Sequence, residues 1–232
     1  MCGIITTPAL NCQSKPCKLS VMNILITAGP TREALDPVRF LSNRSTGKMG
    51  FAIAQAAAER GHAVTLIAGP VTLPTPPGVT RVDVVSALDM LDAVRRHLPQ
   101  HDALVMCAAV ADWRPRQASP VKLKKSDMRP VLELEPNPDI LKTVQPLKGT
   151  RLFVGFAAET GDPLAEARRK LTDKGLDLIV ANDVTEPDAG FAADTNRVTF
   201  LSANEPPAVR PLMSKLGVGR ELVDWLERQQ TP

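Results

Sequence analysis

From Met22 onward the sequence alternates short apolar runs with helical patterns, and this alternation limits the possible folds more than any other feature. Residues 22–29, MNILITAG, form an apolar run that ends in a Gly-Pro turn, as is typical of a buried strand. The same patterns predict strands at residues 62–70 and 102–112 and helices at residues 47–61 and 86–98. Such alternation favours right-handed βαβ units, and therefore a parallel sheet with helices on both faces.

The second half of the chain continues this pattern less regularly. It predicts strands at residues 151–159, 176–183 and 197–202, a helix at residues 162–175 and a final amphipathic helix from Ser214 to Gln229. Between the halves, residues 113–138 bear Pro and Lys, and VKLKK (121–125) and PVLELEP (130–136) alternate like a β-hairpin or flap. We expect a single α/β domain over residues 22–232, with a Rossmann-like, doubly wound, mainly parallel sheet and a protruding flap.

Residues 1–21 differ from the rest of the chain, because they hold three of its four cysteines without helical or strand periodicity. Cys2, Cys12 and Cys17 lack the paired spacing of a zinc site, so we expect a disordered tail with reduced thiols in a cytoplasmic protein. The net charge of +3 over 232 residues indicates no nucleic-acid partner. No apolar run approaches the roughly 18 residues of a membrane span, which indicates no membrane partner either.

The stretch RFLSNRSTGKMG (residues 39–50) resembles a phosphate-binding loop at the start of a helix, yet it fits neither common pattern. A dinucleotide fingerprint needs three closely spaced glycines directly after the first strand, and a Walker A loop needs Ser or Thr after its lysine. Here Met49 follows the lysine. Because backbone N–H groups at a helix start still bind anions, we expect a phosphate or substrate loop that includes Arg39, Ser45, Gly47 and Lys48.

Polar clusters follow several of the predicted strands, namely TAGPTRE, AAVADWRP, GFAAET and ANDV. In parallel α/β sheets ligands bind at the carboxyl ends of the strands, so these clusters predict one site at one edge. Lys122 and Lys124 point to one face of an extended segment, where they either protect a solvated edge strand or close on phosphates. Lys170 and Lys174 share a helix face, and a surface stripe paired with Glu166 explains their spacing equally well.

Long motifs show a resemblance to a known family. ILITAGPTREALDPVRFLSNRSTGKMGFAIA, CAAVADWRP, VKLKK, NPDIL, GFAAET and DLIVANDV occur in this order and span most of the chain after residue 21. They resemble the phosphopantothenate–cysteine ligases, the synthetase half of bacterial bifunctional coenzyme A biosynthesis proteins. The resemblance implies that 4′-phosphopantothenate and CTP form an acyl-cytidylate and pyrophosphate, after which L-cysteine displaces CMP to form the amide. It also implies Mg²⁺ as cofactor and a homodimer in which the flap of one subunit reaches the other's site.

Matching the family motifs position by position implies the site residues. Asn43 resembles the asparagine that contacts the acyl-cytidylate, and Lys122 resembles the flap lysine that serves this intermediate, so both are the implied catalytic residues. The implied CTP-binding residues are Met106, Cys107, Ala108, Asp112, Lys122, Pro138, Asp139, Ile140, Leu141, Phe156, Lys170 and Lys174. For the last two lysines the resemblance favours nucleotide binding over a surface stripe. The Asp112 carboxylate either accepts a hydrogen bond from the cytosine amino group or binds ribose hydroxyls.

Two other functions are compatible with the same architecture. An NAD(P)-linked oxidoreductase is disfavoured, because the glycine fingerprint is absent and the second strand ends in LIAGP without an acidic residue. A regulatory nucleotide-binding module without catalysis is disfavoured because Asn43 and Lys122 are present.

The 21 residues before the first strand do not resemble the flavin-dependent decarboxylase of the bifunctional proteins, so we expect no decarboxylation. The three histidines share no triad or ligand spacing, and the metal ligands stay unassigned.

Overall fold

The computed structural model describes residues 20–125, 131–159, 164–183, 188 and 190–230, so most of the predicted N-terminal tail lies outside the described residues. The main sheet contains β1 (Asn23–Ala28), β4 (Ala63–Ala68), β5 (Val79–Asp83), β6 (Ala103–Met106), β9 (Leu152–Glu159), β10 (Leu178–Asp183), β12 (Thr199–Ser202) and β13 (Ala208–Val209). The helices are α1 (Lys48–Glu59), α2 (Ala87–His97), α3 (Ile140–Val144), α4 (Leu164–Asp173) and α5 (Lys215–Gln230), with 3-10 turns η1 (Leu98–Gln100) and η2 (Gln145–Leu147). Short strand pairs join β2 (Arg32–Ala34) to β3 (Phe40–Ser42), β7 (Trp113–Pro115) to β8 (Leu134–Pro136), and β11 (Thr195–Asn196) to β14 (Met213–Ser214).

The main sheet has the strand order β13-β12-β10-β9-β6-β1-β4-β5, so both halves of the sequence contribute to it. Neighbouring strands from β5 to β10 are parallel, whereas β12 and β13 pair antiparallel at one edge. The parallel part has the strand order of a doubly wound nucleotide-binding sheet. In such a sheet the first and fourth of its strands in chain order are neighbours, and here these are β1 and β6. The predicted Rossmann-like, mainly parallel α/β fold is therefore confirmed.

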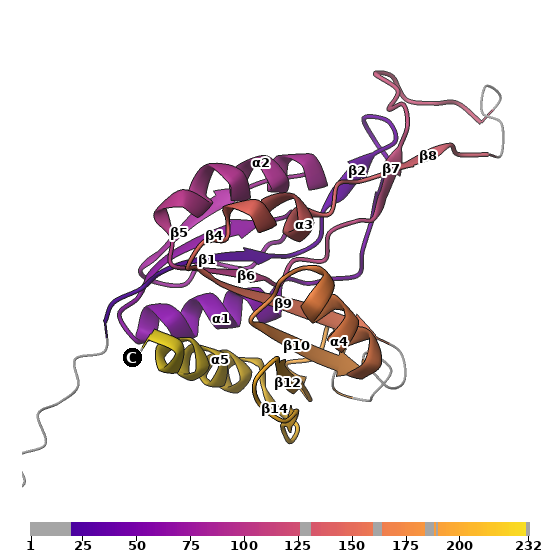
Figure 1. Cartoon of the computed structure of the whole chain (residues 1–232). Helices are drawn as coiled ribbons and strands as arrows, with labels where there is room; N and C mark the ends of the chain where they lie inside the picture. Colours follow the sequence, from indigo (N-terminus) through magenta and orange to yellow (C-terminus); the bar gives the residue numbers. More distant parts are fainter. Residues whose placement is uncertain (1–19, 126–130, 160–163, 184–187, 189, 231–232) are drawn as a thin grey trace, which may run out of the picture.

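The side chains of the central strands alternate between two hydrophobic cores, one on each face of the sheet. Ile24 and Ile26 of β1 belong to the core formed with α1 and α5, while Leu25 belongs to the core formed with α2, α3 and α4. Figure 1 shows α2 and α3 on one side of the sheet and α1 and α5 on the other. Because both faces of the central parallel strands β1, β4 and β6 are covered, their sequences are continuous apolar runs rather than alternating ones.

Local signals determine where the helices begin and end. Ser86 caps α2, because its hydroxyl accepts the Asp89 N–H at 3.1 Å and the Asp89 carboxylate accepts the Ser86 N–H at 2.8 Å. Gly61 follows α1 with φ 84°, and its N–H donates to the Ala58 carbonyl at 3.0 Å, so it ends the helix as predicted. The final helix begins at Lys215, one residue after the predicted start. None of the described helices is both long enough and apolar enough to cross a membrane.

The segment between the two halves protrudes from the sheet, but its pairing differs from the prediction. Trp113–Pro115 pairs with Leu134–Pro136, and Figure 1 shows this β7–β8 hairpin extending beyond the main sheet. The strand predicted at residues 121–125 is wrong, because the backbone there bonds to the β2–β3 turn instead of a neighbouring strand. The Leu123 N–H donates to the Asp36 carboxylate at 3.2 Å, and the Leu123 carbonyl accepts from Arg39 at 2.9 Å.

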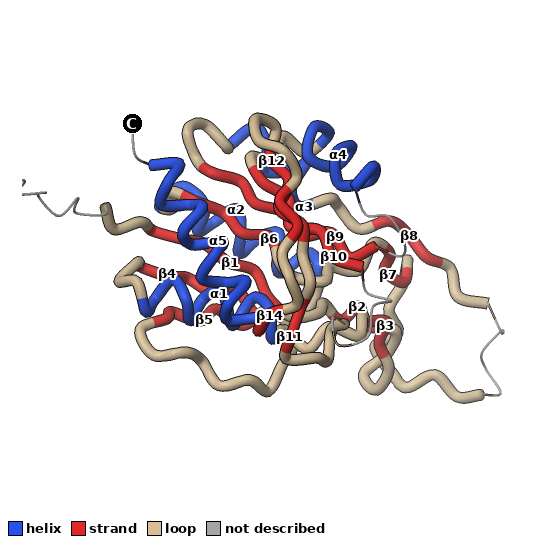
Figure 2. The backbone as a smooth tube through the Cα atoms, turned by 90° about the horizontal axis from the view of Figure 1, so that it is seen from below, coloured by secondary structure: helices blue, strands red, loops and turns tan. Residues whose placement is uncertain are grey.

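Helix α1 lies close to strand β1 because Gly50 has no side chain. A Cβ placed on Gly50 would lie 2.5 Å from the Ala28 Cβ and 3.0 Å from the Thr27 carbonyl oxygen. A Cβ on Gly219 of α5 would lie 2.9 Å from the Ala52 carbonyl oxygen, and Figure 2 shows α1 and α5 side by side. These two contacts set where the N-terminus of α1 stands relative to the carboxyl end of β1.

We predict that Gly50→Ala lowers the free energy of unfolding by about 1–3 kcal/mol, because the added methyl group overpacks the contact between α1 and β1. Urea denaturation followed by circular dichroism measures the change. Gly217→Ala is the control, since its new Cβ would have Ser214 Oγ as nearest atom at 3.3 Å. For this control we expect a change within about 1 kcal/mol. Equal stability of the wild type and Gly50→Ala would contradict the close approach.

Candidate functional site

The carboxyl ends of β1 and β6 mark the point where the chain turns to opposite faces of the sheet. After β1 the chain leads to α1 on one face, and after β6 it leads through the β7–β8 hairpin to α3 on the other. In doubly wound sheets ligands bind in the crevice that this divergence leaves. A pocket of about 420 Å³ lies there, and its walls include residues 45–50 and 106–112.

Thr27, near the end of β1, joins the two sides of this crevice. Its buried hydroxyl accepts hydrogen bonds from the N–H groups of Cys107 and Ala108, both at 3.2 Å. The strand predicted over residues 102–112 therefore ends at Met106, because the next two N–H groups bond to a side chain. Residues 107–111 follow this junction and form a wall of the pocket.

Two further side chains hold the 107–111 segment. Thr31 Oγ1 accepts the Ala111 N–H at 3.0 Å, and the Asn43 side-chain amide donates to the Ala109 carbonyl at 2.9 Å. Asn43 is solvent-exposed and also lines the pocket. The bond to Ala109 therefore holds the Asn43 carboxamide at the rim of the pocket, against the wall that follows β6.

Most residues that the sequence analysis predicts for the site line this one pocket. The predicted phosphate or substrate loop contributes Ser45, Gly47 and Lys48, and Asn43 lies beside them. The predicted CTP-binding residues contribute Met106, Cys107, Ala108, Asp112, Pro138, Asp139, Ile140, Leu141, Phe156 and Lys174. Segments that follow β1, β6 and β8 thus meet Phe156 of β9 in one place, while the role of each residue in binding CTP stays a prediction.

The two lysines at the end of α4 differ in position. Lys174 lines the pocket, and its ammonium lies 3.1 Å from the carboxylate of Asp139, which lines the same pocket. Lys170 does not line the pocket, and it pairs with Glu166 at 3.6 Å, the partner that its helical spacing indicates. The structure therefore brings one of the two predicted lysines to the pocket of its own chain.

Arg39 and Lys122 also lie outside the pocket of their own chain. The Arg39 guanidinium binds the Asp36 carboxylate at 2.5 Å, and this hydrogen bond holds the pKa of Asp36 below its ordinary range. The same pair bonds to both backbone groups of Leu123, the neighbour of the exposed Lys122. Arg39 and Asp36 therefore fix the backbone that carries Lys122, and whether this lysine serves a site stays a prediction.

Positive groups gather where α1 begins. Gly47 has φ 81°, a left-handed conformation, and no side chain caps the helix that follows it. Lys48 is the first residue of α1, and the buried Lys215 is the first residue of α5; both line the pocket. Burial lowers the pKa of Lys215 and Lys48 lowers it further, whereas Cys107 and Asp194 oppose the shift. A helix N-terminus beside two lysines favours an anionic ligand.

Cys107 lines the pocket but is not activated as a nucleophile. Burial of the thiol raises its pKa to about 12, and the charge of Lys215 opposes the shift only weakly. The thiol is therefore protonated at neutral pH, whereas the thiolate is the form that attacks electrophilic centres. Within the described residues, the pocket offers charge and hydrogen bonds rather than an activated thiol.

The described residues contain no group of three or more His, Cys, Asp or Glu side chains that could hold a metal ion. Asp112 and Asp139 line the pocket as single carboxylates, and Asp139 is paired with Lys174. Mg²⁺ in nucleotide enzymes is held by one or two carboxylates together with water and substrate phosphates. This donor set therefore fits Mg²⁺ held mainly by a bound nucleotide.

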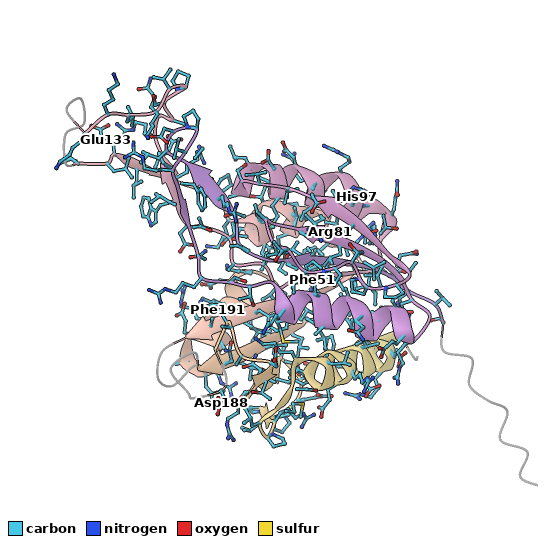
Figure 3. All side chains as sticks on the ribbon, turned by 180° about the vertical axis from the view of Figure 1, so that it is seen from behind. Phe51, Arg81, His97, Glu133, Asp188 and Phe191 are labelled. Carbon is cyan, nitrogen blue, oxygen red and sulfur yellow. The ribbon has the colours of Figure 1, made fainter. Side chains whose placement is uncertain are left out.

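Sequence reasoning missed part of the pocket wall. Asn182 lies in the ANDV cluster at the end of β10, where strand-end polarity signals a site without identifying the residue. Phe191 and Asn196 come from the region between β10 and α5, Lys215 is the first residue of α5, and no motif signals the three. Figure 3 shows Phe191 near the first turn of α1, and its carbonyl accepts from the Thr46 hydroxyl at 2.8 Å.

Residues 19–229 match the family described as DNA/pantothenate metabolism flavoprotein C-terminal domain. The chain belongs to this family. It is 50% identical over 210 residues to the coenzyme A biosynthesis bifunctional protein CoaBC of Escherichia coli (strain K12), and 49% identical over 202 residues to that of Bacillus subtilis (strain 168). The crystal structure of the C-terminal domain of CoaBC matches with a TM-score of 0.77 at 42% identity, covering 90% of this chain and 95% of that chain.

The two bifunctional relatives are matched only in part. The matches cover 89% and 87% of this chain but 52% and 50% of the two relatives, so the chain spans about half of their length. Because the match is to the C-terminal domain, the resemblance to the synthetase half is confirmed. The alternative of an NAD(P)-linked oxidoreductase finds no support among these relatives.

We predict that Thr27→Val lowers the free energy of unfolding by about 1–3 kcal/mol, because two backbone N–H groups lose their acceptor. Hydrogen exchange at the Cys107 and Ala108 amides should accelerate, and mass spectrometry of peptides from this segment measures the rate. Thr80→Val is the control, because Thr80 is exposed on the edge strand β5. For this control we expect a change within about 0.5 kcal/mol. Unchanged exchange in Thr27→Val would mean that the hydroxyl does not hold the segment.

Proposed function

We propose that this chain is a CTP-dependent phosphopantothenate–cysteine ligase. It joins 4′-phosphopantothenate and L-cysteine through an acyl-cytidylate, releases pyrophosphate and CMP, and so contributes to coenzyme A biosynthesis. The observation that carries the proposal is the single pocket that gathers Asn43, a helix N-terminus, three lysines and residues 106–112 in a member of this family. The relatives at 50% and 49% identity are coenzyme A biosynthesis proteins, which supports it.

The chemistry of the pocket suits activation of a carboxylate. A carboxylate acylates poorly at neutral pH, so it is first converted to a mixed anhydride with a nucleotide, and this brings several negative charges together. Lys48, Lys215 and the N-terminus of α1 offer the positive charge that such a site needs. Asp112 and the phosphates of a bound nucleotide would hold Mg²⁺, which would supply further positive charge to the phosphate groups. The protonated thiol of Cys107 agrees with a route that forms no covalent bond to the enzyme.

Asn43 stands at the rim, where the acyl group meets the nucleotide in this proposal. Its side-chain amide already donates to the Ala109 carbonyl, so its position is fixed before substrate binds. A neutral amide there hydrogen-bonds the acyl carbonyl as the cysteine amine attacks and the carbon becomes tetrahedral. A carboxylate in its place would instead repel the negative charge that develops on this oxygen.

A homodimer completes the site in the proposal, because Lys122 lies outside the pocket of its own chain. Exposed apolar side chains gather around the same protruding segment: Val38, Phe40, Trp113, Val121, Val131, Leu132 and Leu134. Exposed apolar surface of this kind favours association with another protein surface. A second copy seated there brings its Lys122 to the pocket, where the ammonium serves the acyl-cytidylate.

The proposal is tested by pyrophosphate release from CTP that depends on 4′-phosphopantothenate, with the cysteine adduct identified by mass. We predict that Asn43→Asp and Lys122→Gln each lower kcat by about 10²–10³-fold, with smaller changes in the KM for CTP. Asn204→Asp and Lys124→Gln make the same charge changes at exposed positions and should stay near wild type. Wild-type protein that releases no pyrophosphate under these conditions would exclude the ligase, and full activity in either site variant would exclude that residue's role.

A mixing experiment tests the shared site. We predict that Asn43→Asp and Lys122→Gln proteins, each nearly inactive alone, regain about a quarter of wild-type activity when equal amounts are dissociated and reassociated. Half of the dimers are then mixed, and one of their two sites combines native Asn43 with native Lys122. Size-exclusion chromatography with light scattering shows whether dimers form at all. If dimers form but mixing restores no activity, each Lys122 acts within its own chain.

A further inference from the structure

Residues 190–194, GFAAD, form a loop whose carbonyl oxygens all face hydrogen-bond donors. The Lys215 ammonium donates to the carbonyls of Gly190 and Phe191 at 3.1 Å and of Ala193 at 2.5 Å. The remaining two carbonyls, of Ala192 and Asp194, accept from the Lys48 ammonium at 2.8 Å and the Lys215 N–H at 2.9 Å. Five consecutive carbonyls are therefore bonded to two lysines of the pocket.

The 190–194 loop also binds the start of α1 directly. The Thr46 hydroxyl donates to the Phe191 carbonyl at 2.8 Å, and the Lys48 ammonium lies 2.6 Å from the Asp194 carboxylate. Thr46, Lys48 and Phe191 all line the pocket, and Figure 3 shows Phe191 near the first turn of α1. The loop therefore lies against the helix N-terminus at which an anionic ligand is expected to bind.

The two lysines differ in how firmly they are held. Lys215 is 6% exposed and uses its three ammonium protons on three loop carbonyls, so it has no donor left for a ligand. The side chain of Lys48 is 34% exposed, and that of its partner Asp194 is 89% exposed. A pair so accessible to water is weak and exchanges partners readily. Lys48 can therefore leave Asp194 for a phosphate, whereas Lys215 cannot leave the loop.

We propose that Asp194 competes with the polyphosphate chain of the nucleotide for Lys48, while Lys215 is a positioning residue that holds the 190–194 loop against the α1 N-terminus. The proposal rests on the proposed nucleotide-dependent function, which it deepens by naming what restrains Lys48 in the unliganded enzyme. A polyphosphate that reaches the helix N-terminus offers Lys48 several oxygens, and the ammonium then exchanges the carboxylate for them. Binding is weaker than it would be without Asp194, because the ion pair must first be broken.

Isothermal titration calorimetry of the full chain with CTP, CMP and inorganic tripolyphosphate tests the competition. Asp194→Asn should bind CTP and tripolyphosphate about two- to fivefold more tightly than wild type, because Lys48 no longer has to leave a carboxylate. Asp224→Asn controls for net charge, since Asp224 lies on helix α5 and pairs there with Arg60, which follows α1. In a Lys48→Met background Asp194→Asn should bring no gain. Equal or weaker binding by Asp194→Asn, or the same gain without Lys48, would overturn the proposal.

Lys215→Met tests the positioning role. It should bind CTP about tenfold more weakly than wild type and bind CMP with a smaller loss, because the loop is no longer held. Methylammonium added to Lys215→Ala, whose short side chain leaves space for it, should restore part of the CTP affinity, and it should not restore Lys48→Ala. If Lys215→Met does not fold, Thr46→Val removes another bond to the loop and should weaken CTP binding about threefold. Unchanged CTP affinity in whichever of these variants folds, or no rescue of a folded Lys215→Ala, would exclude the positioning role.

Tripolyphosphate separates this inference from the proposed function. It lacks the base and the ribose of CTP, so its binding depends on the cationic part of the pocket alone. If the wild type makes no phosphopantothenoylcysteine but Asp194→Asn still binds tripolyphosphate more tightly, the ligase assignment fails and the competition stands. If the wild type is an active ligase and Asp194→Asn shows no gain, the competition fails and the ligase stands.

Discussion

Strands β1 and β6 lie side by side, yet the chain leaves their carboxyl ends toward opposite faces of the sheet. This divergence opens a crevice. The Thr27 hydroxyl stabilises its wall by accepting hydrogen bonds from the first two backbone N–H groups beyond β6. Unpaired, such groups would cost about 1–3 kcal/mol each. The remaining walls are positioned from the same junction. Gly50 sets how closely α1 approaches β1, and Thr31 and Asn43 hold the segment that follows β6.

The buried ammonium of Lys215 is stabilised by hydrogen bonds that replace those it would make to water. Lys215 satisfies its ammonium protons with neutral carbonyls, so the cost of losing water is offset while its net charge remains. Because the dielectric constant of the interior is low, the Lys215 ammonium attracts an anion at a given distance more strongly than the ammonium of a surface lysine would. The N-terminus of α1 adds partial positive charge, and Gly47 places it without a capping side chain that would compete with a ligand. A site that gathers cations in this way can stabilise a polyphosphate without any activated nucleophile.

The sequence was sufficient wherever local pattern and tertiary structure agree. The apolar runs of β1 and β4 are covered on both faces, so composition alone identifies them as buried strands. Ser86 and Gly61 mark helix ends through interactions within a few residues. The edge strand β5 was missed, because its residues are half exposed and show neither a continuous apolar run nor a clear alternation. Strand-end polarity indicated the edge of the sheet at which the pocket lies, and family motifs then pointed to many residues of the pocket wall.

Contacts between residues distant in sequence explain what the patterns could not predict. The 121–125 segment alternates like a strand, yet the Asp36 carboxylate, 87 positions before Leu123, captures its backbone. Lys48 pairs with Asp194, which lies 146 positions later in the sequence, and no local sequence pattern predicts this pairing. The region between β10 and α5 lies beyond the parallel part of the sheet, so the rules of doubly wound folds do not place it. It nevertheless covers the start of α1, because the carbonyls of residues 190–194 are the groups within reach that can satisfy a buried ammonium. The least predictable part of the wall is therefore the part that bonds to Lys48 and Lys215.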